Sequence, residues 1–186
     1  MGNSLQKIIK DDLYRCSGSR SFQSFLKVYF NSPGFHFLCW LRLTHVVRKK
    51  NKLMYILPKL WLRHLSYKYG FDIPAETIIG NGLYIGHFGG VVISSKAVIG
   101  ENCNLSQNVT IGVNVRGKRK GYPIIKDNVY IGPGAVIIGG ITIGNNVAIG
   151  ANAVVLDNIP DDSVVVGVPG KVISSKGSDG YILNKV

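Results

Sequence analysis

The chain has 186 residues, 46% of them hydrophobic, and a formal net charge of +12. This length allows one solenoid and a small appended domain, and the hydrophobic content is ordinary for a folded soluble chain. Residues 1–73 hold thirteen Lys or Arg against three Asp or Glu, but no nucleic-acid-binding motif accompanies them, so nucleic acid is not expected as a partner. Three widely spaced cysteines argue against a disulfide framework.

Residues 1–70 are expected to form a small α-helical N-terminal segment, because apolar residues recur there at the spacing of amphipathic helices. In the first two expected helices these residues are Leu5, Ile8, Ile9 and Leu13, then Phe22, Phe25, Leu26 and Tyr29. The run Ser17-Gly18-Ser19 separates these two helices, and Gly70 ends the last helix of the segment. Pro58 predicts either a kink in that last helix or a later start.

The helical segment combines aromatic and aliphatic residues with many Lys and Arg. Such a pattern can lie on an anionic membrane surface. The favoured interpretation is that the apolar faces pack on each other and on a partner subunit and leave the basic side chains in water, and both arrangements can hold together. No signal peptide is recognisable. The longest candidate for a spanning run, Phe35–Leu41, is far short of the roughly twenty residues that a membrane-spanning helix needs. The expected location is the cytoplasm, with peripheral contact at the inner membrane as an option.

Residues 71–173 are expected to form a parallel β-helix, because an aliphatic residue returns there every sixth position. This series comprises Ile79, Ile85, Ile93, Ile99, Leu105 and Ile111, then Ile125, Ile131, Ile137, Ile143, Ile149 and Val155. A short fixed period is typical of a solenoid whose repeats bury their apolar faces against their neighbours. Three short strands per coil would make a triangular prism with Gly and Asn at its corners. An ordinary β domain does not hold one phase for this long.

Residues 112–124 interrupt the six-residue phase and are expected to project as a loop, and residues 174–186 follow the coils as a C-terminal tail. The loop contains the basic run Arg116-Gly-Lys-Arg-Lys120. Loops on a regular scaffold often carry binding groups, so the run favours an anionic ligand, although a solvated loop tip has the same composition.

His87 is the histidine whose position and neighbours suggest a catalytic role. It follows Ile85-Gly86 at a predicted corner of the prism, and Asp72 lies fifteen residues earlier, nearly one coil back. A carboxylate next to one ring nitrogen would fix the tautomer and raise the basicity of the other nitrogen. The pattern alone leaves open whether the two side chains meet. No constellation of metal ligands is recognisable, so no metal is expected.

Residues 71–173 resemble the serine O-acetyltransferase family within the hexapeptide-repeat, left-handed β-helix acyltransferases. The matching stretches include Phe71-Asp-Ile-Pro, Ile85-Gly-His-Phe-Gly-Gly-Val-Val, Gln107-Asn-Val-Thr-Ile-Gly112, Val129-Tyr-Ile-Gly-Pro-Gly-Ala-Val and Val166-Gly-Val-Pro-Gly-Lys-Val-Ile. The resemblance implies a mainly β fold, a left-handed parallel β-helix, in which His87 is the catalytic general base and Asp72 its acid partner. It also implies that acetyl-CoA is the co-substrate and binds between neighbouring β-helices of a homotrimer, with a dimer of trimers as an option. The positions matching the coenzyme strip are Val113, Pro133, Ala148, Ala151 and Lys171.

Two departures from the family pattern concern the acceptor. Serine-acetylating members carry Asp at the position of Gly86 and Arg-His at the positions of Gly121 and Tyr122. Those charged groups hold free serine, whereas an aromatic face such as Tyr122 suits a sugar. The sequence therefore favours an O-acetyltransferase acting on a sugar hydroxyl of a bacterial surface polysaccharide or its precursor. Serine O-acetyltransferase is the alternative, and a catalytically inactive trimeric scaffold, which the presence of His87 disfavours, is a third.

Overall fold

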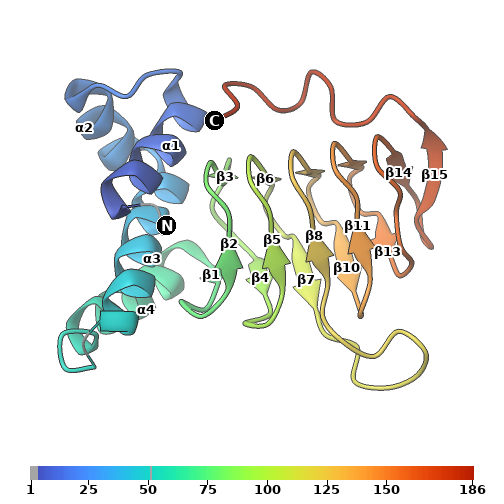
Figure 1. The fold of residues 1–186 in the computed structure, drawn as a ribbon, viewed down its shortest axis with the longest axis horizontal. Coiled ribbons are helices and arrows are strands. Elements are labelled where there is room, and N and C mark those ends of the chain that lie inside the picture. The colour runs from blue at the N-terminus through green and yellow to red at the C-terminus, as the bar shows by residue number, and fades with distance from the viewer. Residues whose placement is uncertain (1–3, 51) are drawn as a thin grey trace.

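The computed structural model describes residues 4–50 and 52–186, and it consists of a helical cap on one end of a β-prism (Figure 1). The four helices are α1 (Leu5–Ser17), α2 (Phe22–Asn31), α3 (Pro33–Lys50) and α4 (Ile56–Tyr69). The start of α4 at Ile56 places Pro58 in the first turn, where no intrahelical hydrogen bond needs its missing N–H. Within the described residues, no helix combines the length and apolar character needed to cross a membrane.

Fifteen strands follow the cap and form the three faces of a prism. They are β1 (Phe71–Asp72), β2 (Ile78–Ile79), β3 (Tyr84–Ile85), β4 (Val91–Ile93), β5 (Val98–Ile99), β6 (Asn104–Leu105), β7 (Thr110–Gly112), β8 (Ile124–Ile125), β9 (Tyr130–Ile131), β10 (Val136–Ile138), β11 (Thr142–Ile143), β12 (Ala148–Ile149), β13 (Val154–Val155), β14 (Val164–Val166) and β15 (Lys171–Ser174). Face 1 has the order β1-β4-β7-β10-β13, face 2 β2-β5-β8-β11, and face 3 β3-β6-β9-β12-β14-β15.

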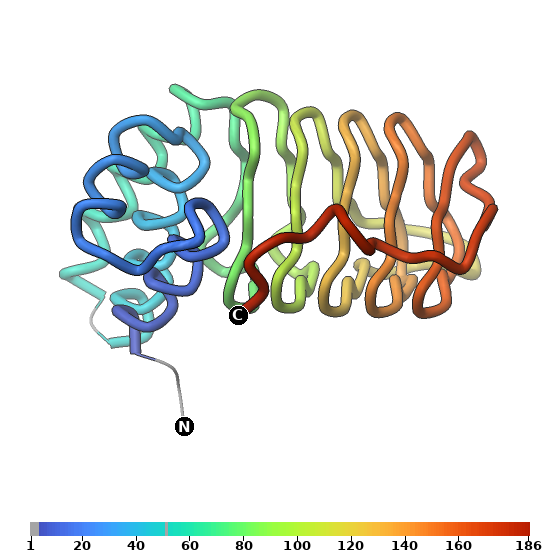
Figure 2. The backbone as a smooth tube through the Cα atoms, turned by 90° about the horizontal axis from the view of Figure 1, so that it is seen from above, coloured from blue at the N-terminus to red at the C-terminus, as the bar shows by residue number. Residues whose placement is uncertain are grey.

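Every strand pair on these faces is parallel except β14 with β15. Successive coils therefore stack in register, as the tube in Figure 2 shows. The expected left-handed parallel β-helix behind a small helical segment is confirmed.

The six-residue series forms the core of the prism. On face 3, for example, Ile85, Leu105 and Ile131 lie opposite one another on neighbouring strands, and each is at most 1% exposed. Neighbouring coils thus bury each other's inward side chains, as expected for a solenoid.

Two edges of the prism matter for the site. The 3–1 edge consists of the turns that lead from face 3 to face 1, and the 1–2 edge consists of the turns that lead from face 1 to face 2. On the 3–1 edge a residue with positive φ recurs once per coil at Gly90, Asn108, Gly134 and Asn152. Gly and Asn adopt this left-handed conformation more readily than other residues, which explains their place in the repeat.

The C-terminal residues 174–186 do not project from the last coil. Figure 2 shows them running back along the outside of the coils towards the helical cap. Tyr181 stacks on Tyr130 of face 3 at 4.5 Å between ring centroids. The backbone N–H of Val186 donates to Asn102 Oδ1 at 2.9 Å. The tail therefore covers part of face 3.

Gly34 of α3 sets how closely the cap approaches the first coil. A Cβ at this position would lie 2.2 Å from the carbonyl oxygen of Ile85 and 2.9 Å from the Ile85 Cβ. Both are rigid parts of a buried strand, so the helix would have to move away.

We therefore expect Gly34→Ala to lower the free energy of unfolding by about 1–3 kcal/mol, the usual cost of overpacking. Urea denaturation followed by circular dichroism measures this change. Gly112→Ala is the matched control, because its Cβ would meet Ile138 at an ordinary 3.5 Å. An equal stability loss in both variants would contradict the close packing of α3 on β3.

Candidate active site

His87 lies in the turn from β3 to β4, on the 3–1 edge of the coil next to the cap. The turn is fixed on both sides, because Gly86 N–H donates to Leu105 O at 3.2 Å and Gly89 N–H to Tyr69 O at 2.8 Å. Gly89 has a positive φ of 105°. The imidazole is exposed, so it can approach a substrate bound on the outer surface of the prism.

Asp72 lies on β1, where it pairs with Val92 of β4, and its side chain is exposed. It therefore belongs to face 1 and His87 to the turn that leads onto the same face. Across residues 4–50 and 52–186, no hydrogen bond or ion pair joins the Asp72 carboxylate to His87. The pairing of the two side chains stays a prediction.

Two of the five positions expected to contact the coenzyme share the 3–1 edge with His87: Pro133 follows β9 and Ala151 follows β12. Lys171 begins β15 on face 3 next to this edge, because the preceding Gly170 N–H donates to Val154 O of β13 at 2.7 Å. Ala148 differs from them, because it is 3% exposed and lies between its partners Tyr130 and Val164 on face 3. Its small side chain offers little surface to a ligand in this arrangement.

Tyr122 and Val113 lie at the two ends of the loop on the 1–2 edge. The loop closes on itself by two hydrogen bonds between the backbones of Asn114 and Gly121, at 3.0 and 2.9 Å. Lys96 lies over the Tyr122 ring, 5.4 Å from its centroid. The Asn114–Gly121 hydrogen bonds and the Lys96 contact hold Tyr122 beside the preceding coil on this edge.

The basic run of the loop is only partly neutralised. Arg119 donates to Asp157 Oδ1 at 2.9 Å. Arg116, Lys118 and Lys120 form no ion pair among the described residues. The loop therefore retains cationic side chains that could meet an anionic ligand.

The two groups of candidate residues lie on opposite edges of face 1 within one chain. His87 stands where the chain enters this face, and Tyr122 stands where the chain leaves it. About five residues separate the two edges, and at roughly 3.3 Å per residue of strand the separation is on the order of 15 Å. A single chain thus does not bring His87 and Tyr122 to the same small acceptor.

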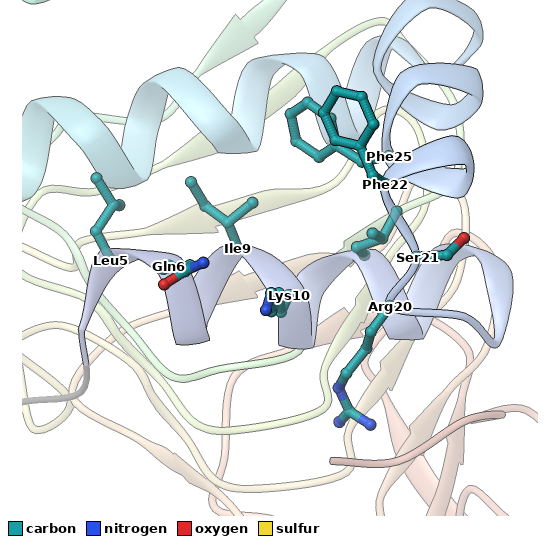
Figure 3. A pocket seen from close by; sticks show the side chains of 9 residues that line it. Leu5, Gln6, Ile9, Lys10, Arg20, Ser21, Phe22 and Phe25 are labelled. Carbon is teal, nitrogen blue, oxygen red and sulfur yellow. The ribbon is translucent and has the colours of Figure 1, made fainter.

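A large cavity lies away from His87. An apolar groove of about 700 Å³ lies between α1 and α2. Figure 3 shows Leu5, Ile9 and Phe25 among the residues that line it. The candidate catalytic turn instead lies on an open outer edge of the prism.

Neither metal nor thiol chemistry has support in the described part of the chain. Residues 4–50 and 52–186 contain no cluster of three or more His, Cys, Asp or Glu side chains that could hold a metal ion. Burial raises the pKa of Cys16, Cys39 and Cys103 to about 12. These thiols remain protonated at neutral pH and are poor nucleophiles.

Comparison with known proteins identifies the family. Residues 122–157 match the bacterial transferase hexapeptide (six repeats) model, and residues 96–118 match the hexapeptide repeat of succinyl-transferase. The chain is 39% identical over 153 residues to the serine acetyltransferase of Synechococcus elongatus, a match that covers 82% of this chain and 62% of that enzyme. It is 37% identical over 172 residues to the serine acetyltransferase of Staphylococcus xylosus, covering 92% of this chain and 79% of that enzyme.

Solved structures agree with these sequence relatives. Soybean serine acetyltransferase complexed with serine superposes with a TM-score of 0.78 at 31% identity, covering 91% of this chain and 70% of the soybean chain. A serine acetyltransferase in complex with CoA gives a TM-score of 0.75 at 29% identity, covering 91% and 70% of the two chains.

These relatives overturn the prediction of a polysaccharide-directed enzyme, which is wrong. The prediction rested on Gly86, Gly121 and Tyr122. The likeness to serine acetyltransferases instead runs through most of the chain, cap included. Loss of charged groups at these three positions does not by itself create a sugar site. The chain belongs to the serine acetyltransferase family of hexapeptide-repeat acyltransferases.

Proposed function

We propose that this protein transfers the acetyl group of acetyl-CoA to the hydroxyl of serine. The observation that carries the proposal is the exposed His87 on a fixed glycine-rich turn, within a chain whose solved relatives include a complex with serine and a complex with CoA.

His87 acts in this proposal as a general base and then as a general acid. Its neutral imidazole takes the proton from the serine hydroxyl as the oxygen attacks the thioester carbonyl. When the tetrahedral intermediate collapses, the carbon–sulfur bond breaks and the imidazolium returns the proton to the departing sulfur. The ester, the free thiol and neutral His87 result, so no covalent enzyme intermediate is needed.

The positions that could bind the coenzyme carry small and cationic side chains. Pro133 and Ala151 present a narrow apolar strip along the 3–1 edge, which suits a pantetheine arm. Lys171 at the end of this strip, together with Arg116 and Lys118 of the loop, would bind phosphate groups. The chemistry that acetyl-CoA supplies when bound is an acetyl group activated as a thioester.

The active site in this proposal is shared between two copies of the chain in a homotrimer. His87, Pro133 and Ala151 occupy one edge of face 1, and Val113 and Tyr122 occupy the other edge. When one prism lies beside another, the 3–1 edge of one copy can face the loop of its neighbour. A closed ring of three copies would complete three such sites.

The contacts to serine would be weaker than in relatives with a fully charged site. Position 86 is glycine, so it supplies no carboxylate for the serine ammonium group. Position 122 is tyrosine, which supplies one hydroxyl and a ring for the rest of the molecule. We infer that the enzyme has a high KM for serine.

Replacing His87 tests the proposed reaction directly. Wild-type protein should release CoA thiol from acetyl-CoA in the presence of L-serine, and His87→Gln should reduce kcat by about 10²–10⁴-fold, because it removes the proton acceptor. The measurement is thiol release, with the O-acetylserine product identified by mass spectrometry. Release without serine, or release that His87→Gln leaves unchanged, would refute the proposal.

Gly86→Asp tests the acceptor contact. A Cβ at Gly86 would lie 3.4 Å from the Tyr84 ring, and this glycine does not have a positive φ, so the position accepts a side chain. The new carboxylate should lower the KM for serine on the order of tenfold, the value of a charge-assisted hydrogen bond. Gly86→Asn is the control, since it fills the same space without the charge. An unchanged KM in Gly86→Asp would contradict the placement of the serine ammonium group at this turn.

Mixing two inactive variants tests the shared site. One variant is His87→Ala. In the other, an Asn-Gly turn replaces Val115–Lys120, because the Asn114–Gly121 pairing closes the loop at its base. Each variant alone should show little thiol release, and trimers formed by co-expression should regain activity at interfaces with one intact His87 and one intact loop.

The control for this experiment combines both changes in one chain and mixes that chain with His87→Ala. It should stay inactive, since no copy supplies the imidazole. Mixed trimers that are seen by native mass spectrometry but show no restored activity would indicate that His87 and the loop act within one chain.

A further inference from the structure

Helix α4 is apolar on two opposite sides. Leu62 and Leu65 are buried against the rest of the protein, at 6% and 1% exposure. On the other side Leu57, Leu60 and Tyr67 are 78%, 58% and 75% exposed. Their spacing of three and seven residues places them on one stripe of the helix. Arg63 of the same helix donates to the Tyr67 hydroxyl at 3.1 Å, and the side chains of this stripe otherwise face solvent.

Helix α2 adds a second exposed stripe. Phe22, Leu26 and Phe30 follow one another at four-residue spacing and are 74%, 41% and 78% exposed. Four-residue spacing keeps the three side chains on one side of the helix.

A chain of ring contacts joins the two stripes. Phe30 meets Tyr29 at 5.3 Å between ring centroids, and Trp40 Nε1 donates to the Tyr29 hydroxyl at 3.0 Å. Trp40 in turn lies 5.9 Å from Trp61 of α4, which is 45% exposed. We call Leu57, Leu60, Trp61 and Tyr67 of α4 the cap surface, and Tyr29 and Trp40 connect it to the exposed stripe of α2.

The cap surface is flanked by positive charge that no acid neutralises. Lys59, Arg63 and Lys68 of α4 form no ion pair within residues 4–50 and 52–186. Each lies over a tyrosine ring instead, at 5.4, 5.6 and 5.3 Å from the centroid. The acids of α1, Asp11 and Asp12, are used in ion pairs with Arg20 and Arg42.

The positive charge beside the cap surface indicates which kind of partner binds there. A second copy of the chain would bring the same positive flank to the same surface, and like charges would oppose that contact. An anionic lipid bilayer fits both the exposed apolar side chains and the positive charge beside them. Exposed Leu and Phe side chains enter the interfacial region, Trp and Tyr rings suit its boundary, and Lys and Arg meet the lipid phosphates.

We propose that the cap surface docks the protein peripherally on an anionic lipid bilayer. The cap forms one end of the molecule, beyond the first coil (Figure 1). A cyclic trimer, which rests on the proposed function, would present three cap surfaces at the same end and bind with avidity. The His87 turn would then lie close to the membrane, because Gly89 N–H is bonded to Tyr69 O at the end of α4.

Vesicle flotation of the full chain tests this proposal. The protein should float with vesicles of phosphatidylcholine mixed with phosphatidylglycerol, should float far less with phosphatidylcholine alone, and should dissociate at high salt. Leu57→Ser combined with Leu60→Ser should weaken partitioning roughly tenfold or more, since two exposed apolar side chains no longer enter the bilayer. Lys59→Gln combined with Arg63→Gln should weaken it by a similar factor.

Matched controls separate the cap surface from overall composition. Leu156→Ser with Leu183→Ser removes two other exposed leucines, and Lys176→Gln with Lys185→Gln removes two positive charges from the tail. Both controls should bind the anionic vesicles like wild type. Equal loss in the controls, or no flotation of the wild type, overturns the proposal. Light scattering on the same variants tests whether the cap surface instead binds a second copy of the chain. A larger assembly of the wild type that Leu57→Ser with Leu60→Ser dissociates would overturn the membrane proposal. Thiol release with serine is measured separately, so failure of docking and failure of the proposed reaction are distinguishable.

Discussion

The ion pair between Asp12 of α1 and Arg42 of α3 joins the helical cap to the first coil. The Arg42 Nε lies 2.9 Å from Asp12 Oδ2, and both side chains are buried. Arg42 also donates to the carbonyls of Ile79 and Gly80, and Asp12 accepts from Leu83 N–H at 3.1 Å. Burial raises the pKa of Asp12, and the Arg42 guanidinium opposes that rise. Removing one partner would leave the other as an uncompensated buried charge.

This interaction solves a problem inherent in a solenoid. The first coil has no preceding coil to satisfy its backbone groups or cover its apolar end. Polar side chains of the cap take the place of that missing coil: besides Arg42, Arg15 donates to Gly82 O at 3.0 Å. The first coil also carries the His87 turn, so the cap that protects the end of the prism fixes the candidate catalytic residue as well.

The triangular cross-section of the β-prism limits how the residues of the candidate site can come together. Each coil turns through three faces, so residues only a short distance apart in sequence reach different edges. His87 and Tyr122 flank face 1, and neither turn can reach across it because strand pairing on both sides holds the backbone. The proposed site between two copies rests on this geometry together with the proposed chemistry. The tail adds a further constraint, since Tyr181 covers Tyr130 on face 3 and makes part of that face unavailable to a neighbour.

The sequence by itself determined the β-helix, because a solenoid core is built from local repeats and each inward Ile or Val occurs at a position fixed by its own repeat. It also singled out His87, since Gly86 and Gly89-Gly90 mark a corner without reference to distant residues. It did not determine the acceptor: Gly86 and Tyr122 predict one sugar site, whereas they lie on opposite edges of face 1 and meet in the proposed trimer only between two copies. Only the tertiary structure decided this separation, the docking of the tail and the exposure of the outer stripe of α4. Each depends on contacts between segments far apart in the chain, and no sequence period records such contacts.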